Sequence, residues 1–260
     1  MRGIDDKKAE HERYDVRANE ILNSVRVEEL PASGSQYFPE YLRAPYEYFE
    51  SLLKKQLNSD HKVLEIGAGS GQHTEVLIKS GASVTATDIS DNSLKVLLKR
   101  IKYQLNADVT IKLADMEKLP FEDYSFDCVT SAGSLSYGDN DIVLNEIFRV
   151  LKVGGTFICV DSLNHNPVYA LNRWIHFLRG SRTKSTLQRM PSLALIKKYE
   201  KKFGSCEAEF FGAIVWASPM LKIFGHRFAR TFIDDFDKIF KIKKSAFKFV
   251  MCVKKERRDI

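Results

Sequence analysis

Short apolar runs alternate with amphipathic stretches through the middle of this 260-residue chain, and this alternation constrains the fold more than any other feature. The apolar runs have the length of buried strands and cover residues 62–66, 83–88, 108–115, 126–132 and 154–161. The amphipathic stretches have apolar residues at helical spacing and cover residues 72–80, 91–104 and 140–152. Strands that alternate with helices form a parallel sheet with helices on both faces. The pattern therefore predicts a doubly wound α/β fold.

Both ends of the chain depart from this rhythm. Helices are predicted over residues 5–26 and 40–57, and a basic helical region over about 166–202. A strand over 206–215, a helix over 218–240 and a closing strand over 245–255 complete the pattern. We expect an N-terminal helical cap over 1–58 and a main domain over 59–260. Helical insertions are expected at about 166–202 and 217–241, after the fifth and sixth strands.

Composition sets the class of protein and its expected location. Apolar residues make up 44% and charged residues 28% of the chain, which is ordinary for a soluble globular protein. No run reaches the ~18 to 20 apolar residues of a membrane span. The charged N-terminus lacks the apolar segment of a secretory signal, so we expect a cytoplasmic location. Four scattered cysteines without CxxC, and histidines without ligand spacing, predict no metal site.

Positive charge is concentrated in one segment. Between Arg173 and Lys202 the chain has nine Lys or Arg residues and one acid, Glu200. A basic patch of this kind attracts an anionic partner. A solvated helix face explains the same composition, and the sequence leaves the contact of this segment open among a glycan, a nucleotide and a membrane surface.

A glycine-rich loop follows the first predicted strand. In doubly wound sheets the ligand lies beyond the carboxyl ends of the strands, and Gly67, Gly69 and Gly71 occupy this place. A phosphate-binding P-loop would need a GK[ST] ending, which is absent. A dinucleotide fingerprint needs a small residue where Gln72 stands. Glu65, two residues before the first glycine, is also unfavourable for a pyrophosphate.

Four motifs in register identify the family that the chain resembles. "LEIGAGSG", "TATDIS", "LADMEKLPFEDYSFDCVTSAGSLSY" and "NEIFRVLKVGGTF" are similar to class I S-adenosylmethionine-dependent methyltransferases. They resemble the small-molecule branch, type 11-like, that includes ubiquinone and menaquinone biosynthesis enzymes. The resemblance covers about residues 60–162. It implies a seven-stranded Rossmann-like sheet with an antiparallel last strand, and S-adenosylmethionine as cofactor.

The resemblance also implies which residues hold that cofactor. Glu65 and the glycine loop frame the cationic methionine end, and Asp88 accepts the ribose hydroxyls. Asp115 accepts from the adenine amino group. Tyr14 and Arg17 of the N-terminal helix close over the methionine end. The complete expected set is Glu65, Gly67, Ala68, Gly69, Asp88, Ile89, Asp115, Met116, the carbonyls of Ser131 and Ala132, and Tyr14. Each acid alone has a second reading, as a helix cap or a surface acid.

Three residues are candidates for proton transfer, which a hydroxyl nucleophile requires. His165 follows the fifth strand, and an unperturbed imidazole pKa of ~6.5 suits a base at neutral pH. Its alternative role is to cap the helix that begins near Pro167. His73 is the second candidate, and Asp161 either orients His165 or is itself the base. Tyr137, Arg173 and Trp174 are the expected acceptor-binding residues.

Two features of the sequence predict the acceptor: a motif that is absent and a basic, aromatic segment that is present. "SAGS" stands where a [DN]PP[YF] motif would mark methylation of planar nitrogen, so we do not expect nucleic-acid bases as substrates. Arg with aromatic residues over 172–193 suits an anionic acceptor. "DSLNHNPVYALNRWIHFLRG" is loosely similar to surface-polysaccharide methyltransferases. We therefore expect O-methylation of a sugar or of a nucleotide-linked or phosphorylated glycan intermediate. A quinone-type or other small metabolite is the alternative acceptor. Two alternatives outside the methyltransferases are a nicotinamide-dependent oxidoreductase and a non-catalytic cofactor-binding protein.

Overall fold

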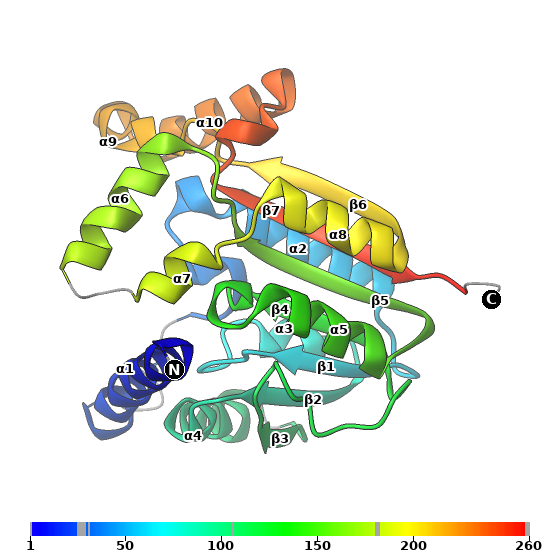
Figure 1. Cartoon of the computed structure of the whole chain (residues 1–260). Helices are drawn as coiled ribbons and strands as arrows, with labels where there is room; N and C mark the ends of the chain where they lie inside the picture. Colours follow the sequence, from blue (N-terminus) through cyan, green and yellow to red (C-terminus); the bar gives the residue numbers. More distant parts are fainter. Residues whose placement is uncertain (1, 25–29, 31, 106, 180–182, 258–260) are drawn as a thin grey trace.

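A seven-stranded sheet forms the core of the protein (Figure 1). The computed structural model describes residues 2–24, 30, 32–105, 107–179 and 183–257. The strand order is β3-β2-β1-β4-β5-β7-β6, and β7 runs antiparallel to both its neighbours while the other pairs are parallel. The predicted Rossmann-like sheet with an antiparallel last strand is confirmed. The strands are β1 Lys62–Ile66, β2 Ser83–Asp88, β3 Thr110–Leu113, β4 Phe126–Ala132, β5 Leu151–Ser162, β6 Gly204–Phe211 and β7 Lys248–Lys255.

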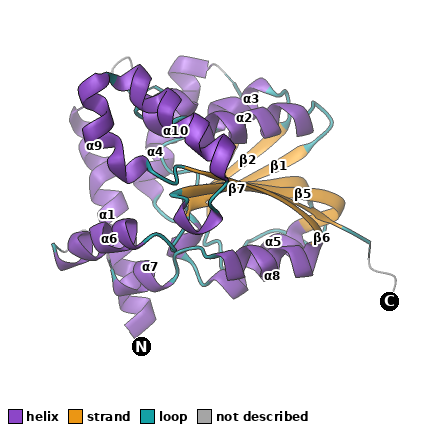
Figure 2. Cartoon of the chain, turned by 90° about the horizontal axis from the view of Figure 1, so that it is seen from above, coloured by secondary structure: helices purple, strands orange, loops and turns teal. Residues whose placement is uncertain are grey.

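Helices cover both faces of this sheet (Figure 2). Alternate residues of a strand point to opposite faces, so Val63 packs under one helical layer and Leu64 under the other. Helices α2 and α3 cover the first face, and α5 and α8 cover the second. The helices are α1 Arg2–Ser24, α2 Ala44–Gln56, α3 Thr74–Lys79, α4 Asp91–Arg100, α5 Asn140–Val150, α6 Pro167–Leu178, α7 Lys184–Gln188, α8 Leu193–Phe203, α9 Ser218–Leu221 and α10 His226–Phe240. None of the described helices is both long and apolar enough to cross a bilayer.

Several predicted boundaries were wrong, because local geometry ends an element before its apolar pattern does. β6 ends at Phe211 instead of residue 215, since Gly212 has a φ of 75° and turns the chain. The predicted helix over 218–240 is interrupted at Gly225, whose φ is 103°. β3 is shorter than predicted and ends two residues before Asp115. Helix α4 continues as a π-helical segment over Ile101–Leu105. The predicted end of the first helix, residues 25 and 26, lies outside the described residues.

The predicted insertion over 166–202 contains two different kinds of helix. Helices α6 and α7 lie outside the sheet layers, but α8 buries Leu195, Tyr199 and Phe203 in the same core cluster as β5 and β7. It is therefore the layer helix that precedes β6, and the expected insertion was too long. The basic residues of α8 suggested an exposed insertion, but they occupy only the exposed side of an amphipathic helix whose other side is buried.

The N-terminal segment has two separate roles. Helix α2 packs on the sheet, with Phe49 and Leu53 in the same cluster as Val63 and Val250. Helix α1 instead lies against the start of α4, where Asp15 accepts hydrogen bonds from the Ser90 hydroxyl at 2.8 Å and the Asn92 side-chain amide at 2.8 Å. The boundary between residues 58 and 59 stays a prediction. The cap that the structure describes is α1.

Candidate functional site

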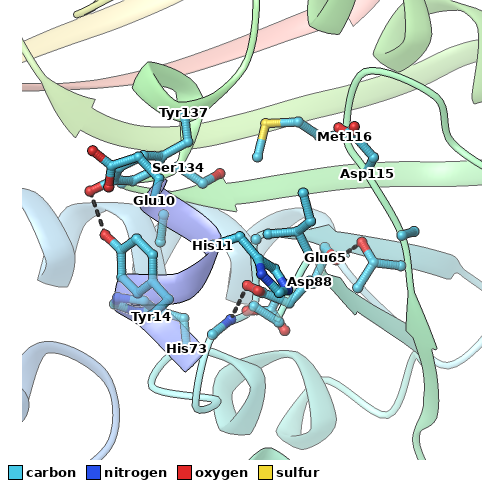
Figure 3. A pocket seen from close by; sticks show the side chains of 18 of the residues that line it. Glu10, His11, Tyr14, Glu65, His73, Asp88, Asp115, Met116, Ser134 and Tyr137 are labelled. Carbon is cyan, nitrogen blue, oxygen red and sulfur yellow. Dashed lines mark hydrogen bonds between the residues drawn. The ribbon is translucent and has the colours of Figure 1, made fainter. Parts of the chain in front are cut away.

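A cavity lies at the carboxyl edge of the parallel strands, between that edge and α1 (Figure 3). The loops after β1, β2, β3 and β4 form its floor, as expected for the ligand-binding edge of a doubly wound sheet. Helix α1 forms its roof. The lining residues are Lys7, Glu10, His11, Tyr14, Glu65, Gly67, Ala68, Gly69, Gln72, His73, Thr87, Asp88, Ile89, Ala114, Asp115, Met116, Ala132, Gly133, Ser134 and Tyr137.

The glycine loop is tied to the neighbouring strand by its backbone. The Ala68 amide donates to the Thr87 carbonyl at 2.9 Å, and the Gly69 amide donates to Asp88 Oδ2 at 2.9 Å. Gly67 has a φ of 66°, and a Cβ there would lie 2.5 Å from the Ser134 Cβ. Only glycine fits this position without strain, because both the backbone conformation and the space exclude a side chain. The backbone is therefore directly exposed to a ligand in the cavity.

Asp88 ends β2 beside this loop, as predicted. Its Oδ1 accepts from the Ser90 amide at 2.8 Å, in addition to the Gly69 contact. Burial raises the pKa of Asp88, and the hydrogen bonds from backbone amides and the nearby His11 oppose that rise. The carboxylate is thus held in a fixed orientation while it faces the cavity.

Glu65 is the most buried acid of the cavity, with 4% of its surface exposed. The Thr74 hydroxyl donates to its Oε2 at 2.6 Å. Burial raises the pKa of Glu65 to about 7, and the negative charge of Asp88 adds to the rise, against the Thr74 hydrogen bond. A cationic ligand would favour the charged form of this carboxyl group, because an opposite charge offsets desolvation.

Asp115 and Met116 line the cavity after β3. Lys7 of α1 forms an ion pair with Asp115, and a second one with Glu117 at 2.9 Å. The Asp115 Oδ1 accepts from the Glu117 amide at 2.9 Å, which closes a tight turn. The loop after β3 and helix α1 are therefore joined at this end of the cavity.

Two tyrosines join α1 to the loop after β4. The Tyr14 hydroxyl donates to the Tyr137 hydroxyl, and the rings meet edge to face with centroids 5.3 Å apart. Burial raises the pKa of Tyr14, and the neighbouring Tyr137 raises it further. Because the Tyr14 proton is used in this contact, the Tyr137 hydroxyl keeps its own proton for another acceptor.

Helix α1 is anchored at a third point, on α7. Glu10 is buried, and its Oε1 accepts from the hydroxyls of Thr183 and Thr186, each at 2.9 Å. Together with the contacts of Asp15 and Lys7, these two hydrogen bonds hold helix α1 in place at three points. Arg17 does not line this cavity but a neighbouring one, which shares Tyr14, Gly69 and Gln72 with it, so its closure over the methionine end stays a prediction.

His73 is the one base candidate that reaches the cavity. Its imidazole stacks on Tyr46, with ring centroids 5.4 Å apart, and meets Phe49 edge-on at 5.6 Å. Burial lowers the pKa of His73 to about 4, and the charge of Lys248 lowers it further. Its buried Nδ1 has no hydrogen-bond partner among the described residues. The imidazole is therefore neutral at physiological pH.

The other two base candidates lie away from the cavity. His165 is exposed, and its Nε2 accepts from the amide of Leu193 at 2.9 Å. It caps α8, so the predicted cap on α6 was wrong, since Asn166 holds that place; the role of His165 as a base stays a prediction. Asp161 is buried beneath the loop after β4, where its Oδ2 accepts from the Leu135 amide at 3.0 Å. Its carboxylate orients that loop, and it does not contact His165.

The expected acceptor residues Arg173 and Trp174 also lie outside the cavity lining. Arg173 is buried and donates to the Leu163 carbonyl at 3.0 Å. Trp174 is 52% exposed on the outer side of α6. Ala132 lines the cavity and Ser131 does not; the Ser131 hydroxyl lies 2.6 Å from that of Ser134, and the role expected of the two backbone carbonyls stays a prediction. The direction of the Arg173 and Trp174 side chains keeps them out of the cavity. This direction cannot be predicted from their position in the sequence alone.

The basic stretch 173–202 does not line the cavity either. Lys198 pairs with Asp141 at 2.6 Å, and Arg189 lies 3.9 Å from Glu117. These two side chains contact acids of the same chain, and an anionic acceptor held by the rest of the stretch stays a prediction. Arg182, another member of the stretch, lies outside the described residues.

The part of the cavity that α1 contributes was not predicted from the sequence. Lys7, Glu10 and His11 share one face with Tyr14, at spacings of three, four and seven residues. That periodicity was available in the sequence, but only the tertiary packing shows what it faces. The remaining missed residues adjoin predicted ones: Gln72, Thr87, Ala114, Gly133 and Ser134.

Comparisons with known proteins agree with this geometry. Residues 64–159 match the model of a methyltransferase domain. Over 118 residues the chain is 37% identical to a demethylmenaquinone methyltransferase of Thermobifida fusca, covering 45% of this chain and 50% of that protein. Over 148 residues it is 28% identical to a fatty-acid O-methyltransferase of Mycolicibacterium smegmatis, covering 56% and 53%. The chain thus spans about half the length of the curated relatives that it matches.

Solved structures show the same fold. Phosphoethanolamine N-methyltransferase 2 of Haemonchus contortus, in complex with S-adenosylhomocysteine, superposes with a TM-score of 0.59 at 19% identity. The match covers 84% of this chain and 55% of that one. The chain therefore has the fold of these methyltransferases, and its residues 64–159 are similar to a methyltransferase domain.

Proposed function

We propose that this chain transfers a methyl group from S-adenosylmethionine to an apolar small molecule. The observation that carries the proposal is the set of three acids at successive strands, Glu65, Asp88 and Asp115, which line one cavity. No arginine is among the lining residues of the described chain, so the cavity suits a ligand with ammonium, sulfonium and hydroxyl groups better than a phosphate. These three carboxyl groups fit the ammonium, sulfonium and hydroxyl groups of the proposed cofactor.

Each acid then has a separate binding role. Glu65 pairs with the cationic methionine end, and Asp88 accepts the two ribose hydroxyls. Asp115 and Met116 hold the adenine, with Ile89 as an apolar wall. When bound, the cofactor supplies a methyl group on a positively charged sulfur. The protein contributes by alignment and by exclusion of water under α1, because an in-line displacement requires the reacting atoms to be collinear.

The acceptor side of the cavity has little charge. Tyr14 and Tyr137 supply aromatic surface there. The Tyr137 hydroxyl is free to donate a hydrogen bond to an oxygen of the acceptor. The neutral imidazole of His73 helps to orient that acceptor oxygen. Relatives named for demethylmenaquinone and for fatty acids support an apolar acceptor of the quinone or acyl type. The expected sugar acceptor stays an alternative, but the basic segment that suggested it is not among the lining residues of the cavity.

Thermal melting with S-adenosylhomocysteine tests the cofactor. A ligand that binds the native state raises the melting temperature by mass action. Asp88→Ala removes charge-assisted hydrogen bonds and should weaken affinity by about 10- to 100-fold. Asp91→Ala is the matched control, since that acid is exposed and pairs with Lys95 at 2.6 Å on the surface of α4. The proposal fails if the wild type shows no shift at saturating ligand, or if a nicotinamide dinucleotide gives the larger shift.

An acceptor screen tests the second half. Release of S-adenosylhomocysteine is measured with polyprenyl quinone precursors, fatty acids and nucleotide sugars. We expect turnover with an apolar acceptor, and Tyr137→Phe should lower it by about tenfold through loss of one hydrogen bond. Turnover with a nucleotide sugar alone would return the assignment to glycan O-methylation.

A further inference from the structure

Large apolar side chains are exposed over residues 216–242, after β6. We call this surface the apolar ridge: Trp216, Met220, Ile223, Phe224, Phe228, Phe232, Ile239, Phe240 and Ile242. Ile223 is 82% exposed, and Phe224 and Ile239 are each 73% exposed. A contiguous apolar surface of this kind on a water-soluble domain marks an interaction site.

The phenylalanines of the ridge follow a regular spacing. They recur every four residues, at positions 224, 228, 232, 236 and 240. Ring centroids are 5.5 Å apart between Phe224 and Phe228, and 6.0 Å apart between Phe228 and Phe232. The stripe therefore continues along the outer side of α10.

The inner side of α10 already supplies the packing that holds the helix. Ala229 and Ile233 are buried, and Arg230 pairs with Glu47 of α2 at 2.6 Å. Asp237 Oδ1 accepts from the Ala213 amide at 2.9 Å. The outer phenylalanines are not needed to attach α10 to the domain, so their exposure calls for a separate explanation.

Positive charge surrounds the ridge. Residues 222–244 contain seven Lys or Arg and three Asp. The three acids are engaged within the chain: Asp234 with Arg230, Asp235 with Lys238, and Asp237 with backbone amides. Arg227, Lys241 and Lys244 are exposed. The outward charge is thus basic, with apolar side chains between the cations.

The ridge is on the same edge of the sheet as the cavity. β6 runs parallel to β5, because both pair antiparallel with β7. The chain therefore leaves β6 at the carboxyl edge, where the glycine loop also lies. Figures 1 and 2 place α9 and α10 together near α6, at one corner of the molecule.

We propose that the apolar ridge docks the protein on the surface of an anionic lipid bilayer. A helix with aromatic residues on one face and cations beside it lies in the interface, with its apolar face in the acyl boundary and its lysines among anionic headgroups. A second copy of this chain is a poorer occupant. Two-fold pairing would bring the same surface of each copy together, and that surface has more cations than acids, seven against three over residues 222–244.

Vesicle co-sedimentation of the full chain tests this inference. Vesicles of phosphatidylcholine, with and without phosphatidylglycerol, are compared at low and high salt. We expect binding to the anionic vesicles, weakened by salt. Lys241→Gln with Lys243→Gln and Lys244→Gln should lower affinity by about tenfold or more. Phe224→Ser with Phe228→Ser should lower it by at least about tenfold, because their burial in the acyl boundary is lost.

Controls separate docking from folding. Leu98→Ser with Leu113→Ser removes apolar side chains of similar exposure, 51% and 56%, on α4 and on the strand at the opposite sheet edge. This variant should bind vesicles like the wild type. Ile223→Ser with Ile239→Ser repeats the test where packing is least, should the phenylalanine variant fail to fold. Both are checked by melting temperature.

Three outcomes overturn the inference. They are no binding to anionic vesicles, equal binding by the ridge and control variants, and a concentration-dependent dimer that the phenylalanine variant abolishes without any vesicle binding. The measurement uses neither cofactor nor acceptor. Failure of the proposed methyl transfer therefore leaves this test intact, and failure of docking leaves methyl transfer intact.

Discussion

At the scale of single residues, the cavity depends on acids whose titration the fold has altered. Glu65 is buried beneath the glycine loop with a pKa of about 7, whereas Asp88 is held by backbone amides at the open side. Two carboxyl groups of similar chemistry therefore respond differently to pH. Burial raises the pKa of both groups, but hydrogen bonds from backbone amides oppose this rise at Asp88.

Glu65 predicts a pH-dependent affinity for the cofactor. Its ionised fraction rises about tenfold between pH 6 and pH 8 around a pKa of about 7, and a cationic ligand favours that form. Calorimetric titration with S-adenosylmethionine should show affinity rising by up to about tenfold over this range. Glu65→Gln should flatten the profile, whereas Glu122→Gln, at an exposed loop, should not. An equal slope in both variants would contradict the assignment.

The same pKa has a consequence for unliganded stability. Between the ordinary value of 4.5 and about 7, the folded state holds a proton on Glu65 that the unfolded chain has released. The free energy of unfolding contributed by this group therefore falls as the pH rises through that window. Denaturant melts of Glu65→Gln and wild type should agree below about pH 4.5 and separate between pH 4.5 and 7, with the variant relatively more stable at and above pH 7.

Gly67 gives a prediction about strain. Alanine at this position meets both a positive φ and a Cβ position 2.5 Å from the Ser134 Cβ, so Gly67→Ala should cost about 2–3 kcal/mol of stability. Gly133→Ala is the control, because its φ is 76° but nothing lies within 4 Å. It should cost about 1 kcal/mol from the backbone alone. Equal costs in chemical denaturation would show that the contact with Ser134 is unimportant.

At the scale of elements, helix α1 is the part that turns an open sheet edge into a closed cavity. It contacts the loop after β3 through Lys7, the loop after β4 through Tyr14, and α7 through Glu10. The helix itself is strongly polar and has little sheet surface to bury. Its position therefore depends on these directed contacts, and each is a point at which the roof can be loosened.

Glu10→Ala tests this dependence. Loss of the hydrogen bonds from Thr183 and Thr186 should cost about 2–3 kcal/mol locally and speed amide exchange in α1 and α7, while β1 and β4 keep their protection. Glu12→Ala is matched on the same helix, where the side chain is exposed and lies 3.9 Å from Lys8. Hydrogen exchange that stays slow in α1 of the Glu10 variant would show that other contacts hold the roof.

At the scale of the whole molecule, two sets of phenylalanines have opposite roles. Phe157 of β5 is fully buried between the sheet and α8, whereas Phe232 of the apolar ridge is 46% exposed. Phe157→Ala should lower the free energy of unfolding by about 3–5 kcal/mol, through loss of burial and a new cavity. Phe232→Ala should change it by only about 0.5 kcal/mol. Denaturant melts of both variants measure the difference, and similar losses would mean that the ridge is part of the core.

The sequence by itself determined the fold class, the order of the strands along the chain, and the acids of the cavity floor. Hydrophobic periodicity is a local property, and parallel strands bring their carboxyl ends to one edge, so Glu65, Asp88 and Asp115 could be placed before any coordinates. The glycine loop was equally accessible, since backbone that approaches a ligand needs glycine.

Only the tertiary structure decided which other side chains face the cavity. His165 caps α8, Arg173 is buried against the Leu163 carbonyl, and α1 supplies Lys7, Glu10 and His11. These outcomes depend on side-chain direction and on contacts between elements more than 100 residues apart, as in the bond between Tyr14 and Tyr137. Local sequence patterns do not predict such contacts. Many side chains could form the same hydrogen bond, and the packing of the whole chain determines which of them does.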